Sequence, residues 1–105
     1  MNIYKVERVD DADTGDYFEF VCLADTAAEA KRLDPQTGMF MFIDGKNNFI
    51  VRTGKPQKWT DNANNVKVTL LGTAVETTTV EYSDGIETNV ILPDMPTILA
   101  ASILE

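Results

Sequence analysis

One segment of the chain combines positive charge with an aromatic ring, as nucleotide binding requires. Arg52, Lys55 and Lys58 are followed directly by Trp59, the single tryptophan. Cationic side chains bind phosphate, and an indole face stacks on a base. Gly54-Lys55 does not form a P-loop, because the upstream glycine and the following Ser or Thr are missing. The competing interpretation, which we favour because tryptophan is usually buried, places Trp59 in the core and leaves the lysines to keep the loop soluble.

Carboxylates crowd a second segment. Five of them lie within ten residues: Asp10, Asp11, Asp13, Asp16 and Glu19. Ca²⁺ prefers such oxygens on a tight turn. The order Gly15-Asp16 reverses the EF-hand pattern, however, and Cys22 stands where the closing glutamate belongs. We therefore expect no metal here and interpret the five acids as a candidate contact for a partner protein with a basic surface.

The charge is arranged in blocks. Residues 1–30 hold eight acids and two bases, residues 31–67 three acids and seven bases, and residues 68–105 six acids and no base. The net charge of −8 argues against direct nucleic-acid binding, because phosphates repel it. It favours a basic partner if the two acidic blocks converge on one face, or it serves solubility alone.

Missing residue types limit the chemistry. The chain has no histidine and one cysteine, which excludes Ser-His-Asp and Cys-His catalysis and Cys/His zinc sites. Cys22 lies between Val21 and Leu23 and is interpreted as an inert core thiol. A pair of neighbouring carboxylates would suit glycosidase chemistry, but it would be weak evidence for that activity, because among 17 acids some pair lies close together by chance. We expect no catalytic residues and no cofactor.

The length of 105 residues predicts a single domain, 1–105. No apolar run approaches the ~20 residues of a membrane span. The first residues lack the apolar stretch of a signal peptide, so we expect a cytoplasmic protein.

The positions of these residues depend on a predicted α+β fold, a mostly antiparallel sheet of about six to seven strands with one short helix on a face. Strands are predicted over residues 3–9 and 17–24, which pair as a hairpin around the acidic turn, and over 39–43, 48–52, 66–71 with a continuation over 75–82, 86–92 and 97–104. Gly72 marks a candidate bulge. Thr26 and Glu29 form a capping box that starts a helix over residues 27–33, before Pro35. Residues 97–104 also fit a helix capped by Asp94, but we favour a strand.

A continuous apolar run gives a candidate interface. Met39, Phe40, Met41 and Phe42 precede Ile43 without a polar residue. A sheet of this size does not always bury both faces of such a strand, and interfaces are enriched in Met and Phe. The run therefore predicts either a homodimer contact or an ordinary part of the core, and the sequence favours neither.

Several segments together resemble a group of small, mostly uncharacterised phage and bacterial proteins. These are the opening Ile3-Tyr4-Lys5-Val6-Glu7-Arg8, the Asp-rich turn, Tyr17-Phe18-Glu19-Phe20-Val21, Ala24-Asp25-Thr26-Ala27-Ala28-Glu29-Ala30, the lone Trp59, Val66-Lys67-Val68-Thr69-Leu70-Leu71-Gly72-Thr73-Ala74 and Ile98-Leu99-Ala100-Ala101-Ser102. Relative to these proteins, residues 36–57 look like an insertion. The resemblance implies a phage origin and no catalysis, and it assigns no functional residues.

Particular residues favour two functions, and a structural virion component also stays open. The first is a phage-type protein that binds and inhibits a host protein, such as a nucleic-acid-binding defence factor, by presenting a DNA-like acidic surface. The second is an oligomeric protein that sequesters a small ligand or nucleotide at Arg52, Lys55, Lys58 and Trp59.

Overall fold

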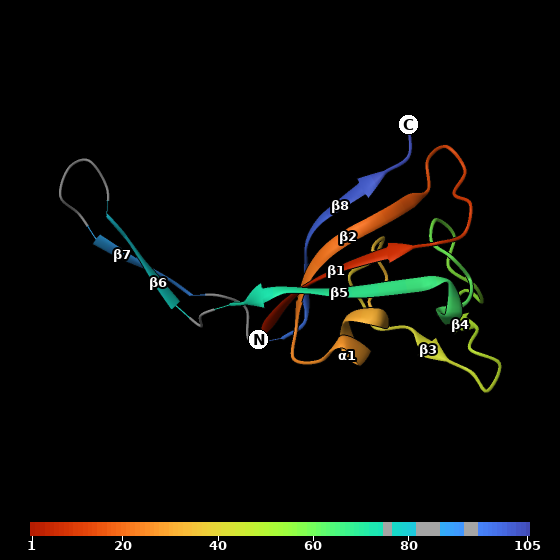
Figure 1. Cartoon of the computed structure of the whole chain (residues 1–105), viewed down its shortest axis with the longest axis horizontal. Helices are drawn as coiled ribbons and strands as arrows, with labels where there is room; N and C mark the ends of the chain where they lie inside the picture. The colour runs from red at the N-terminus through yellow and green to blue at the C-terminus, as the bar shows by residue number, and fades with distance from the viewer. Residues whose placement is uncertain (75–76, 82–86, 92–94) are drawn as a thin grey trace.

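A four-stranded antiparallel sheet forms the centre of the computed structural model, which describes residues 1–74, 77–81, 87–91 and 95–105 (Figure 1). The strand order is β5-β1-β2-β8, so the two edge strands come from the second half of the chain. The strands are β1 (Asn2–Arg8), β2 (Tyr17–Ala24), β5 (Val66–Thr73) and β8 (Thr97–Ile103). The predicted α+β class is confirmed at this level: antiparallel strands with one short helix.

The predicted hairpin of β1 and β2 is confirmed. Tyr4 lies opposite Cys22, and Val6 lies opposite Phe20. All four side chains are buried, whereas Lys5 between them is half-buried on the other face. The period of two in the sequence therefore selects which face of the sheet receives the core.

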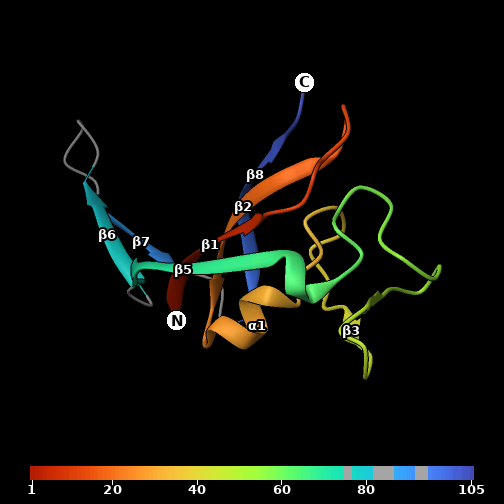
Figure 2. The same ribbon diagram turned by 45° about the vertical axis from the view of Figure 1, so that its right-hand side comes forward.

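The core lies on one face of the sheet, under α1 (Ala27–Lys31) and the segment that joins α1 to β5 (Figure 2). Thr26 caps α1 by accepting a hydrogen bond from the Glu29 amide at 3.2 Å, as predicted. The Thr26 hydroxyl also donates a hydrogen bond to Oε1 of Glu29 at 3.4 Å, so the two side chains of the capping box contact each other directly. The helix ends two residues earlier than residue 33. Leu33 then pairs in an isolated bridge with Phe40.

The joining segment holds a small hairpin, β3 (Phe42–Ile43) and β4 (Phe49–Ile50), and a short 3₁₀ turn, η1 (Ala63–Asn65). Asp44 closes the hairpin turn by accepting from the amides of Lys46 and Asn48, and these bonds lower the pKa of its carboxyl. Asn47 has a φ of 64°, a left-handed conformation that asparagine tolerates.

The apolar run behaves differently from the prediction. Its strand spans only Phe42–Ile43, not residues 39–43. Met41 is 1% exposed and belongs to the core, so it cannot contribute to the predicted homodimer surface. Met39, Phe40 and Phe42 are exposed. Met41 alone among residues 39–43 is buried, because its side chain meets the core, and a wholly apolar sequence does not show which of its residues will do so.

Residues 97–104 adopt the favoured strand conformation, as β8, which pairs with β2. The bulge predicted at Gly72 lies one residue earlier: Ile3 pairs with Gly72 and Tyr4 with Leu70, which leaves Leu71 as the extra residue.

A single sheet of six to seven strands is not formed. The remaining described strands, β6 (Thr77–Glu81) and β7 (Glu87–Ile91), pair with each other as a separate hairpin at one end of the molecule (Figure 1). The turn predicted at Ser83-Asp84-Gly85 and the cap predicted at Asp94 lie outside the described residues.

Candidate functional site

Residues 10–16, in the connection between β1 and β2, are called here the acidic tip. Arg8, the last residue of β1, holds it in place. Its Nε donates to Oδ1 of Asp10 at 2.8 Å, and its Nη2 donates to Oδ2 of Asp10 at 2.9 Å. Nη2 also donates to the Asp11 carbonyl at 3.1 Å, and Nη1 lies 3.7 Å from Oδ2 of Asp16. The geometry at Asp10 is the two-pronged arrangement that makes arginine–carboxylate pairs strong.

The Arg8 side chain is nearly buried. Its guanidinium lies 5.9 Å from the centre of the Trp59 ring, within cation–π range. Thr60 donates a hydrogen bond to Oδ2 of Asp10 at 3.0 Å, and Asn65 donates to Thr60. The hydrogen bonds from Arg8 hold the pKa of the Asp10 carboxyl below its ordinary value, and Asp10 in turn raises the pKa of Arg8.

The five predicted contact acids therefore have different surroundings. Asp10 and Asp16 face Arg8, and Glu19 lies 3.4 Å from Nζ of Lys5 on the outer face of the sheet. Asp11 and Asp13 are exposed. These two are the acids that the tip offers to solvent without an ion pair among the described residues.

The C-terminal end of the chain lies beside the tip. The Gly15 amide donates to the Leu104 carbonyl at 2.8 Å, and the Leu104 amide donates to the Asp16 carbonyl at 2.8 Å. These bonds bring the exposed Glu105 to the same end of the sheet. Glu105 belongs to the third charge block and lies near the acids of the first block. Their wide separation in the sequence gives no sign of this proximity.

The other described acids of the third block do not converge there. Glu81 and Glu87 are paired positions in the backbone register of the β6–β7 hairpin, which lies at the opposite end of the molecule (Figure 1). Glu76, Asp84 and Asp94 lie outside the described residues, so one acidic face built from both blocks stays a prediction. Of the described third-block acids, Glu105 lies at the tip.

The four predicted ligand residues are separated. Trp59 is 4% exposed and packs against Phe20 with ring centres 5.3 Å apart, so its face is not open for stacking on a base. Arg52, Lys55 and Lys58 are exposed. The interpretation of Trp59 as a core residue is confirmed.

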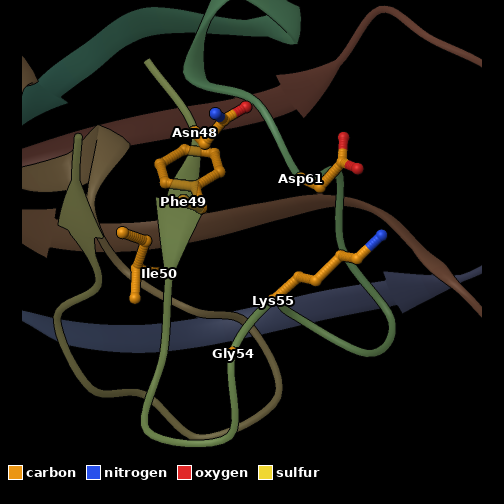
Figure 3. A pocket seen from close by; sticks show the side chains of 6 residues that line it. All are labelled: Asn48, Phe49, Ile50, Gly54, Lys55 and Asp61. Atoms are coloured by element: carbon orange, nitrogen blue, oxygen red, sulfur yellow. The ribbon is translucent and has the colours of Figure 1, made fainter. Parts of the chain in front are cut away.

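A shallow pocket of about 340 Å³ lies beside Lys55 (Figure 3). Asn48, Phe49, Ile50, Gly54, Lys55 and Asp61 line it. Figure 3 shows Lys55 and Asp61 on the same side of the pocket and the Phe49 and Ile50 side chains on the other. The pocket thus combines one charge of each sign with an apolar wall. Arg52 and Lys58 do not line it.

The chemistry of the remaining groups is limited. Cys22 is buried, and burial raises the pKa of its thiol to about 11, so the thiolate is scarce at neutral pH. Among the described residues, no three acids or cysteines lie close enough to hold a metal ion. Within the same ranges, no helix is long and apolar enough to cross a membrane.

Comparison of the chain with protein-family models, with curated proteins and with solved structures finds no significant match.

Proposed function

We propose that this chain is a small non-enzymatic protein that binds a partner protein with a basic surface through its acidic tip. The carrying observation is the Arg8 network, which neutralises Asp10 and Asp16 while Asp11 and Asp13 project outward. A loop held in this way is ordered before binding, so association loses little conformational entropy. Exposed charges of one sign increase the rate of encounter with a basic surface.

The partner proposed is a host protein that binds nucleic acid, encountered in the cytoplasm and inhibited by occupation of its basic groove. The resemblance to small phage and bacterial proteins supports this finer proposal. A groove that accepts phosphates attracts carboxylates by the same field. The tip is narrow, so we expect it to cover part of such a groove rather than its length.

The test compares the wild-type chain with Asp11→Asn/Asp13→Asn in capture experiments from host lysate, read by native mass spectrometry. We expect a stoichiometric host protein on the wild type and about tenfold weaker binding to the variant at low salt, with the difference shrinking as salt rises. Asp25→Asn removes an exposed charge elsewhere and should bind normally. Equal capture by the wild type and the double variant at low salt would refute the proposal.

A second candidate function is small-ligand binding at the Lys55 pocket. Its support is the hollow itself, in which a cation faces an apolar wall. Asp61 on the same side opposes an anion, so phosphate binding requires the Lys55 charge to dominate.

Calorimetric titration with a nucleoside monophosphate distinguishes this candidate. We expect saturable binding that Lys55→Gln abolishes and Arg52→Gln leaves intact, because Arg52 lies outside the pocket. Asp61→Asn should strengthen binding. A flat titration of the wild-type protein would remove this function.

A further inference from the structure

One side of the β3–β4 hairpin is apolar and faces solvent. Phe42 pairs with Ile50 across the hairpin, so their side chains share one side. Phe40, which the buried Met41 separates from Phe42, is exposed as well. The exposed fractions are 43% for Phe40, 74% for Phe42 and 41% for Ile50. These three side chains are called here the apolar hairpin face.

The opposite side of the hairpin anchors it to the core. Met41 and Phe49 are each 1% exposed. The Met41 amide donates to the Arg32 carbonyl at 2.7 Å, and the Phe49 amide donates to the Asp61 carbonyl at 2.9 Å. Because these contacts orient the hairpin, the apolar hairpin face cannot turn inward. Exposed aromatic residues gathered in this way mark interaction surfaces more often than scattered ones do.

Positive charge flanks the apolar hairpin face. The Arg32 guanidinium lies 5.0 Å from the centre of the Phe40 ring, and its Nε donates to the Met41 carbonyl at 3.0 Å. At the other flank, Lys55 lines the pocket next to Ile50. Neither cation is in an ion pair within the part of the chain that the structure describes. A suitable occupant therefore presents an apolar side chain next to carboxylates.

The chain itself contains a surface of that chemistry. Val9 is 65% exposed and precedes the acidic tip, whose Asp11 and Asp13 are exposed. We propose that the apolar hairpin face binds Val9 and the acidic tip of a second copy of this chain. Contact of two apolar hairpin faces with each other is disfavoured, since it would bring Arg32 and Lys55 toward their own copies.

The placement of the two surfaces favours a closed dimer. Both lie toward the end of the molecule that is opposite the β6–β7 hairpin (Figure 1). Two copies can therefore exchange contacts reciprocally about a two-fold axis, with each tip on the hairpin face of the other copy. A dimer built in this way hides Asp11 and Asp13, so a basic partner and a second copy compete for the same tip.

This inference does not rest on the proposed function, because it is tested on purified protein alone. Sedimentation velocity over a concentration series should show a reversible monomer–dimer equilibrium. Phe42→Ser should weaken the dimer at least tenfold, because an exposed aromatic anchor is lost. The matched control is Leu71→Ser, which removes an exposed apolar side chain from β5 and should leave the equilibrium unchanged. Circular dichroism checks that each variant is folded.

A charge variant separates this contact from general stickiness. Asp11→Asn/Asp13→Asn changes the net charge from −8 to −6, which lowers the repulsion between copies. Unspecific association would therefore strengthen, whereas the proposed contact should weaken about tenfold. A wild-type chain that stays monomeric into the high micromolar range, an unchanged Phe42→Ser equilibrium or a strengthened Asp11→Asn/Asp13→Asn dimer would each overturn the proposal.

Discussion

Arg8 donates to four oxygen atoms around the acidic tip: both carboxylate oxygens of Asp10 and the carbonyls of Asp11 and Tyr17. Asp10 also accepts from Thr60, fifty residues away in the chain. The pair thus ties the tip to the segment that carries Trp59. Lys5 and Glu19 form a more exposed pair, which contributes little to stability.

At the residue scale, we predict that Asp10→Asn lowers the free energy of unfolding by about 2 kcal/mol at neutral pH, since it leaves a nearly buried guanidinium short of a charge partner. The pKa of Asp10 is lowered from its ordinary 3.8. Its contribution is therefore complete above about pH 4 and is lost as pH falls through the lower folded-state pKa. Urea unfolding of both proteins from pH 7 to pH 2 checks this. The gap between them should narrow in acid, and a constant gap would contradict the role of the ion pair.

At the element scale, α1 is a helix of five residues that depends on its cap. A helix this short has little intrinsic stability, so its N-terminal hydrogen bond and the burial of Ala30 hold it on the sheet. We predict that Thr26→Ala destabilises the chain by about 1 kcal/mol in urea unfolding. Thr14→Ala, at an exposed threonine of the acidic tip, serves as the control and should change stability by less than about 0.5 kcal/mol. Equal effects would show that the cap has no special role.

At the scale of the whole molecule, the chain leaves the sheet after β5 and returns as β8 at the opposite edge. Among the described strands, β6 and β7 pair with each other and are not hydrogen-bonded to the four-stranded sheet. We predict that a flexible six-residue linker can replace residues 75–94 and leave the sheet folded. The linker must cross three strand spacings, about 14 Å, which six residues can span. Buried-type Trp59 fluorescence and a cooperative melt should persist. Red-shifted Trp59 emission together with a non-cooperative melt would show that the replaced segment is part of the core.

Local patterns predicted the elements that depend on near neighbours. Alternation of apolar and polar residues identified β1, the aromatic and apolar run after the acidic turn identified β2, and Thr26 with Glu29 identified the start of α1, because these signals act over a few residues. The segment between residues 39 and 65 was less predictable. Its run of apolar residues contains no alternation, so the separation of Met41 from Phe42 depends on which side meets the core.

Composition and local periodicity were enough for the net charge, the absence of histidine and the two alternating sets of side chains in β1, because neither requires knowledge of distant contacts. Long-range packing, by contrast, selects which acids of the tip form ion pairs among the described residues. Arg8 has several acids within reach in sequence, and the choice of Asp10 depends on Thr60 and Trp59, which arrive from far along the chain. The same holds for Glu105 at the tip and for the outward apolar hairpin face, since long-range packing places both.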